Sequence, residues 1–220
     1  MAIITRPLIY SGLGIFSIFL LLSFPRNALA VECFSSPPSV EEGRDVFDPV
    51  EPRDLVDDES GNLEELFKSL SGRWTGRADI EVCSDAEDES ATENEEFSIE
   101  SRIDFRQRRE FSIISKLSSL EKSTKYQDAI YLCLDRKRLA TVCNFSVSDI
   151  ELITVTQDKL EYVQKAFKRP NRLAGEVGAD KVREAITRIQ KTGNTSFTIE
   201  KLIYLQGKLT TRETWQLEMK

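Results

Sequence analysis

The stretch Gly72-Arg73-Trp74-Thr75-Gly76-Arg77-Ala78-Asp79-Ile80-Glu81-Val82-Cys83 decides the fold. Every second residue is apolar or small, namely Trp74, Gly76, Ala78, Ile80 and Val82. The residues between them are polar or charged. A period of two predicts a strand with one buried face and one solvated face. A tryptophan between glycines at the start of the first strand of an all-β region favours a closed barrel.

From Phe97 onward, short segments with strand character follow one another with turns between them. The predicted strands cover residues 97–105, 111–117, 129–134, 139–147, 150–156, 160–167, 196–205 and 209–219. In the last hairpin, Gly207 supplies the positive φ of a tight turn. A three-residue loop there places Lys201 opposite Glu213 on the inner face, either as a ligand contact or as an ion pair at the wet rim.

Two helices are predicted in addition to the strands. Asn62 caps a short helix before the Trp74 strand, with apolar residues at three- and four-residue steps from Leu63 to Leu70. Val182, Ala185, Ile186 and Ile189 trace one face of a second helix over residues 179–191. This helix is expected either as a lid on a barrel end or as a connector on the outside.

The first thirty residues resemble an export signal. Arg6 precedes an apolar run over residues 8–24, and Ala28-Leu29-Ala30 matches a signal peptidase site. The alternative is an uncleaved membrane anchor, but the run is short for a membrane span. We therefore expect a signal peptide over residues 1–30 and no permanent membrane span after cleavage. The protein would reach the periplasm, the thylakoid lumen or the cell exterior as a secreted protein.

Residues 31–61 contain four prolines among many acids, which predicts a linker or an extended arm before a barrel domain at 62–220. Charge is distributed unevenly: residues 32–96 carry a balance of −16 and residues 97–220 one of +7. An acidic arm of this kind would select a basic protein partner, or simply form a solvated surface. A negative overall charge of −7 argues against nucleic acid as a partner.

All four cysteines follow the predicted cleavage site, which indicates disulfides in an exported protein. Cys133 and Cys143 would pair across a hairpin and leave Cys33 to pair with Cys83; a bond from Cys83 to a barrel cysteine is the alternative. The chain has no histidine and no Cys-x-x-Cys pair, which argues against zinc and against triad chemistry. We therefore expect a protein without a cofactor that is not an enzyme.

An acidic loop follows Cys83. Asp85, Glu87, Glu89 and Glu96 have a spacing similar to that of a calcium loop, but Ser90 occupies the position that needs glycine. No helices are predicted on either side. A solvated loop is the favoured interpretation, so no metal site is predicted.

The triplet Gly72-Arg73-Trp74, preceded by a short helix, resembles the Gly-x-Trp signature of the lipocalins and other calycins. This resemblance implies an antiparallel up-and-down β-barrel of about eight or nine strands, with a short helix before it and one inserted helix. It also implies that Trp74 plugs the closed end and that an arginine of the last strand, here Arg212, packs across the indole.

Members of this family mostly bind small apolar molecules, so the resemblance implies a lipid, isoprenoid or pigment as ligand. The candidate lining residues are Trp74, Ile80, Ile99, Ile103, Phe105, Phe111, Phe145, Tyr162, Tyr204 and Trp215. The alternative for each of them is simple core packing, and an internal cavity of several hundred Å³ would discriminate the two. A second hypothesis is an interaction or assembly factor acting through the acidic arm and loop. A third, an enzyme using carboxylates or a thiol, ranks below both.

Overall fold

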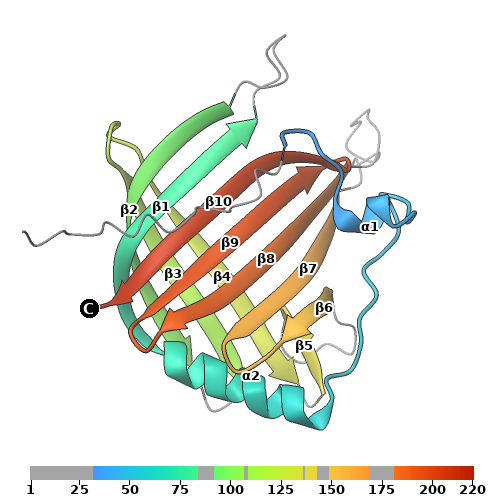
Figure 1. Ribbon diagram of the computed structural model, residues 1–220, viewed down its shortest axis with the longest axis horizontal. Coiled ribbons are helices and arrows are strands. Elements are labelled where there is room, and N and C mark those ends of the chain that lie inside the picture. Colours follow the sequence, from blue (N-terminus) through green and yellow to red (C-terminus); the bar gives the residue numbers. More distant parts are fainter. Residues whose placement is uncertain (1–31, 84–91, 107–108, 136, 143–148, 169–180) are drawn as a thin grey trace, which may run out of the picture. The chain divides into compact units, whose positions relative to one another are not determined.

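Strand β1, Gly72–Cys83, lies in the middle of a single antiparallel sheet of ten strands. The computed structural model describes residues 32–83, 92–106, 109–135, 137–142, 149–168 and 181–220. The strand order is β5-β4-β3-β2-β1-β10-β9-β8-β7-β6. Because β5 and β6 at the two ends of this order meet across a seam, the sheet curls into a nearly closed barrel (Figure 1). The predicted all-β, up-and-down barrel is confirmed, with ten strands in place of eight or nine.

The elements have the following bounds: α1 Pro38–Glu41, α2 Asp57–Leu70, β1 Gly72–Cys83, β2 Thr92–Phe105, β3 Glu110–Ser119, β4 Lys125–Asp135, β5 Arg138–Ala140, β6 Ile150–Val155, β7 Lys159–Lys168, β8 Lys181–Gly193, β9 Ser196–Leu205 and β10 Lys208–Met219.

Alternation along β1 sets the two faces of the barrel wall. Trp74 and Ala78 are buried in the core, whereas Arg73 and Arg77 are exposed. Gly76 lies on the inner face, and a Cβ atom built there would be 1.8 Å from the carbonyl oxygen of Gln216 on β10. Glycine at this position therefore permits the close approach of β1 and β10.

Helix α2 lies across one end of the barrel (Figure 1). It begins at Asp57, six residues before the predicted start, because Val56 and not Asn62 is the N-cap. The Glu59 carboxylate accepts a hydrogen bond from the Val56 backbone N–H at 3.1 Å. The first turn contains three acidic residues, whose negative charges interact favourably with the positive N-terminal end of the helix dipole. The buried face of the helix consists of Leu63, Leu66, Phe67 and Leu70.

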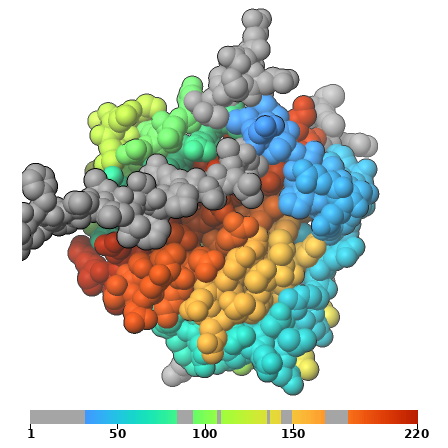
Figure 2. Space-filling view, in the orientation of Figure 1, coloured from blue at the N-terminus to red at the C-terminus, as the bar shows by residue number. Residues whose placement is uncertain are grey.

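The segment from residue 32 to residue 56, called the arm below, packs on the outside of the barrel. Its start is joined to the end of β1 by a disulfide between Cys33 and Cys83, as predicted. Beside this bond, the Phe34 N–H donates to the Leu209 carbonyl at 3.0 Å, and the Leu209 N–H donates to the Ser35 carbonyl at 2.9 Å. Figure 2 shows the arm, in blue, against strands drawn in orange and red.

The later part of the arm bonds to both edge strands of the sheet. Arg44 holds the Glu151 carboxylate of β6 with two hydrogen bonds of 2.9 and 3.0 Å, and the Glu51 N–H donates to the same carboxylate. On β5, Arg138 donates to Asp54 at 2.6 Å. Burial opposes ionisation of Glu151, but the Arg44 guanidinium and the Glu51 N–H together lower the pKa of the Glu151 carboxyl below its usual value. The arm therefore ties β6 to β5 across the seam.

Beneath the arm, the outer face of the barrel carries a second, smaller apolar cluster. It consists of Val163, Ile186, Tyr204 and Leu209, with Val50 and Leu202 packed against it. A buried ion pair lies on the same outer face, with Lys165 Nζ 3.1 Å from Glu184. The hydroxyl of Ser39 in α1 donates to Glu184, and Lys165 donates to the Asp48 carbonyl at 3.0 Å. Burial raises the pKa of Tyr204 to about 12.

The helix predicted over residues 179–191 is wrong, because its described part, residues 181–191, lies in strand β8. All four apolar residues that suggested it are buried, but they divide between two faces. Ala185 and Ile189 point inward, whereas Val182 and Ile186 lie on the outer face, where Ile186 joins the cluster beneath the arm. Burial on both faces removes the alternation that identifies a strand.

The last hairpin has a shorter turn than predicted but the predicted pairing. Only Gln206 and Gly207 form the turn, both with positive φ, and Leu205 pairs with Lys208. A β-bulge between Leu209 and Thr211 then shifts the register by one residue. Because of this bulge, Lys201 lies opposite Glu213 as the longer loop would have placed it. Of the strand predicted over 139–147, residues 139 and 140 lie in β5, and residues 143–147 are outside the described residues. Cys143, the predicted partner of the disulfide-bonded Cys133, is among the latter.

Candidate functional site

Side chains fill the half of the barrel interior that adjoins α2. The Phe67 ring stacks on Phe111 with 4.0 Å between ring centroids, and Phe105 lies 5.7 Å from Phe67. The Trp74 indole N–H donates to the Leu70 carbonyl at 2.8 Å, which satisfies a carbonyl at the helix end. This end of the barrel is closed by a packed core.

Most of the predicted lining residues belong to that core. The buried ones are Trp74, Ile99, Ile103, Phe111, Tyr162 and Trp215, and Ile80 and Phe105 pack against them. Phe145 lies outside the described residues. Tyr204 is placed differently from the prediction, because it lies in the outer cluster beneath the arm. A ligand role for the core residues stays a prediction.

The predicted contact between Arg212 and Trp74 is wrong. Trp74 pairs with Met219 at the end of β10, whereas Arg212 lies near the start of that strand. The Arg212 guanidinium donates to Glu200 at 3.0 Å instead. The aromatic neighbour of Trp74 is Phe197, whose ring meets the indole edge-on at 4.7 Å.

Farther from α2, the interior contains a buried charged cluster. Lys201 of β9, only 9% exposed, pairs with Asp128 of β4, and its Nζ lies 3.5 Å from Glu213 Oε2 on β10. The same ammonium lies 4.2 Å from the ring centroid of Trp215, a cation–π contact. The predicted Lys201–Glu213 pair is thus confirmed, and both side chains are largely buried.

Two tyrosine hydroxyls accompany this cluster. Burial raises the pKa of Tyr162 to about 12, although a hydrogen bond with Thr187 acts in the opposite direction. Burial, reinforced by the nearby carboxylates Glu213 and Asp128, raises the pKa of Tyr126 as well. Both hydroxyls are therefore neutral at physiological pH. Within the described part of the chain, the buried Tyr126 hydroxyl has no hydrogen-bond partner.

A cavity of about 260 Å³ adjoins the cluster. It is lined by Asp128, Ala129, Ile130, Tyr131, Thr141, Tyr162, Gln164, Arg183, Ala185, Thr187 and Lys201. These residues come from β4, β7, β8 and β9, with Thr141 just after β5, so the cavity lies beside the seam. Its volume corresponds to about nine water molecules at the density of the liquid. This is slightly below the usual range for drug-sized ligands and suits a smaller molecule.

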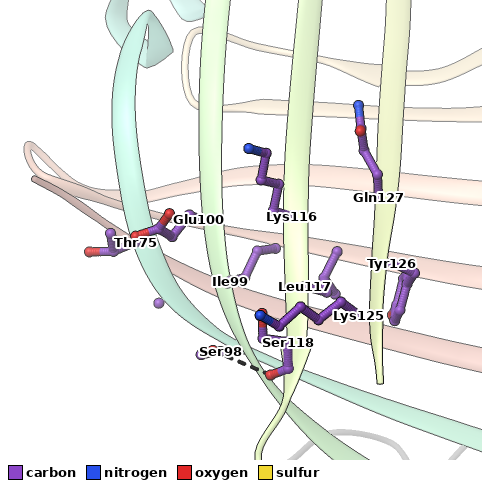
Figure 3. Close-up of a pocket in the computed structure, with 11 residues that line it drawn as sticks. Thr75, Ser98, Ile99, Glu100, Lys116, Leu117, Ser118, Lys125, Tyr126 and Gln127 are labelled. Atoms are coloured by element: carbon purple, nitrogen blue, oxygen red, sulfur yellow. Dashed lines mark hydrogen bonds between the residues drawn. The ribbon is translucent and has the colours of Figure 1, made fainter. Parts of the chain in front are cut away.

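A larger hollow of about 820 Å³ lies along strands β1 to β4 (Figure 3). Glu100 and Lys116, which extend from neighbouring strands in this view, are both exposed. The Ser98 hydroxyl donates to the Ser118 carbonyl at 3.3 Å and so is already satisfied. This groove brings no buried charge together. Tyr126 lines this larger hollow, whereas the Lys201–Asp128 pair and the neutral hydroxyl of Tyr162 converge on the smaller cavity, which is therefore the better candidate site.

Sequence reasoning found Lys201, Glu213 and Tyr162 but missed the other polar residues of the site. Asp128 was missed because the predicted strand began at residue 129, whereas β4 begins at Lys125. Thr187 and Arg183 were missed because β8 was predicted as a helix. The alternation of Asp128 with buried Ile130 and Leu132 was the available signal.

Among the described residues, no group of three or more histidine, cysteine, aspartate or glutamate side chains is arranged to hold a metal ion. Three of the four acids of the calcium-like spacing, Asp85, Glu87 and Glu89, lie outside that part of the chain. None of the helices described is both long and apolar enough to cross a membrane.

Comparison with known proteins gives likeness in fold only. No family model and no curated protein matches the sequence. Among solved structures, an S-type phycobiliprotein lyase from Guillardia theta matches at 10% identity with a TM-score of 0.43, over 75% of this chain and 98% of that one. A DUF3598 protein of unknown function from Nostoc punctiforme matches at 10% identity with a TM-score of 0.39, over 79% and 53%. The 12:0-ACP thioesterase from Umbellularia californica matches at 12% identity with a TM-score of 0.18, over 70% and 76%. At these values the matches assign no family.

The expectation that this chain is not an enzyme requires correction. The matched structures include a lyase and a thioesterase, so enzymes occur among the proteins that it resembles. The absence of histidine and of a catalytic motif therefore does not exclude catalysis.

Proposed function

We propose that this protein binds a small molecule in the cavity beside the seam of its barrel. The observation that supports the proposal is the convergence of Lys201, Asp128 and Tyr162 on a partly enclosed space. Buried charges are costly to retain, and a solid apolar core would need none of them. Such groups are typical of sites that orient a ligand.

The same observations narrow the ligand class that the family resemblance implied. A long lipid or isoprenoid needs a deep apolar channel, but the interior next to α2 is occupied by Phe67, Phe111 and Trp74. The remaining space is small and has a mixed polar and apolar wall. A compact molecule with polar groups, pigment fragments included, matches this space better than an extended hydrocarbon.

Native mass spectrometry of protein purified from its own host tests the proposal. We expect a stoichiometric additional mass that is lost on denaturation. Ala185→Leu, which fills part of the cavity wall without changing charge, should remove that mass. The matched control is Ser98→Leu in the larger hollow along strands β1 to β4, called the outer groove below, and this variant should retain the additional mass. Equal retention by both variants would place the molecule elsewhere, and an unliganded mass for the native chain would contradict the proposal.

We also propose export. Its support is the signal-like sequence of residues 1–30, together with the Cys33–Cys83 disulfide, since disulfides persist in oxidising compartments. Fractionation of the host with an antibody to the barrel tests this. A chain in the exported fraction that starts at Val31 would support export, and a cytoplasmic chain that retains residues 1–30 would contradict it.

A further inference from the structure

The groups deep in the cavity already have partners within the protein. The Lys201 ammonium is shared between the Asp128 and Glu213 carboxylates. The hydroxyl of Tyr162 is hydrogen-bonded to Thr187. A molecule that enters the cavity therefore meets no unpaired charge at this depth.

Arg183 differs from these groups. It lies two residues before Ala185 on the inner face of β8, where it pairs with Leu205 near the end of β9. The Arg183 side chain is exposed, so this part of the lining is the mouth of the cavity. Within the described ranges, the Arg183 guanidinium makes neither an ion pair nor a hydrogen bond, in contrast to Lys201 inside.

A free guanidinium beside a cavity prefers one kind of ligand group. Its planar fork of N–H donors matches the two oxygens of a carboxylate, and such charge-assisted pairs are about twice as strong as neutral hydrogen bonds. A ligand amine would instead be repelled by the same charge.

We propose that the cavity takes small organic acids, with the carboxylate on Arg183 at the mouth and an uncharged body of about ten non-hydrogen atoms inside. This inference rests on the proposed function and adds the ligand class and its anchor. The body would lie against Ala185 and Ile130, with the hydroxyls of Tyr162 and Thr187 within the same cavity wall.

Three probes with the same ring and different charge test the proposal by ¹⁹F NMR titration: 4-fluorobenzoate, 4-fluorobenzamide and 4-fluorobenzylamine. The benzoate should bind about tenfold more tightly than the amide, because a hydrogen-bonded charge contributes roughly one tenfold step or more, and the amine should bind most weakly. Arg183→Gln should weaken benzoate binding about tenfold and leave the amide unchanged. The control Arg77→Gln, on the exposed face of β1, should change neither. Because the Arg183 guanidinium makes no ion pair or hydrogen bond within the described residues, its variant should melt at the native temperature.

The outcomes separate this inference from the proposed function. Tighter binding of the amide or the amine would overturn the ligand class and leave a binding cavity in place. Unchanged benzoate binding in Arg183→Gln would remove this residue as the anchor. Failure of all three probes to bind would overturn the inference, and an unliganded native mass from the host would overturn the proposed function with it. Loss of benzoate binding in Ala185→Leu would support both.

Discussion

Replacement of Lys201 by methionine is the sharpest test of how the interior charges stabilise the barrel. The substitution keeps the length and most of the volume of the side chain but removes the charge. Asp128 and Glu213 then lose their shared cation, with side chains only 29% and 14% exposed. The contact between the ammonium and the Trp215 ring is lost as well.

Removal of one partner of a buried ion pair typically costs 3–5 kcal/mol, because the remaining charge is desolvated without compensation. Asp128 retains some solvent contact, so we expect about 3 kcal/mol, at the lower end of that range. For a domain of this size such a loss lowers the melting temperature by about 6–12 °C.

The assay is urea unfolding of the native chain, of Lys201→Met and of the double variant Lys201→Met/Glu213→Gln. The double variant removes one of the two orphaned charges, so it should recover part of the lost stability. Lys116→Met on the exposed face of β3 is the control and should change the unfolding free energy by less than about 0.5 kcal/mol. A loss below about 1 kcal/mol in Lys201→Met, or no recovery in the double variant, would refute the reasoning.

Three further outcomes are expected. Gly76→Ala should cost at least about 3 kcal/mol, since its Cβ would overlap the β10 backbone, and a circular dichroism melt within 2 °C of native would contradict this. Cys33→Ser/Cys83→Ser should lower the unfolding free energy by up to about 4 kcal/mol, as expected from chain entropy for a 50-residue separation; equal denaturant midpoints would show that the arm contacts suffice without the bond. The lowered pKa of Glu151, held by Arg44, implies a stabilising contribution that is complete above about pH 4.5 and is lost as the pH falls through the folded-state pKa. Melting of Glu151→Gln should therefore approach that of the native chain at pH 3, and a constant difference from pH 7 to pH 3 would argue against it.

The sequence predicted those parts of the fold that bury one face only. The β1 stretch, strand β6 and the final hairpin show alternation because one side of each meets solvent over most of its length. Strand β7 was predicted as well, although residues on both of its faces are buried. Strand β8 was misassigned because the arm covers its outer face. That cover depends on distant contacts, such as Ser39 with Glu184, which no local pattern contains.

The candidate site was predictable only in part, for the same physical reason. Lys201 and Glu213 belong to one hairpin, so their pairing follows from local register even though a bulge rather than a longer loop produces it. Asp128 joins them from β4, 73 residues before Lys201, through closure of the barrel. Arg212 was assigned a role by family resemblance, but its outward direction on β10 takes it to Glu200.

The most direct test of the central proposal is a high-resolution crystal structure of the protein purified from its own host. We predict density for one compact molecule between β4 and β8, with an oxyanion at Arg183 and its body beside Tyr162 and Ala185. Density for water alone in that cavity, or for a molecule seated only in the outer groove along β1 to β4, would contradict a binding site beside the seam.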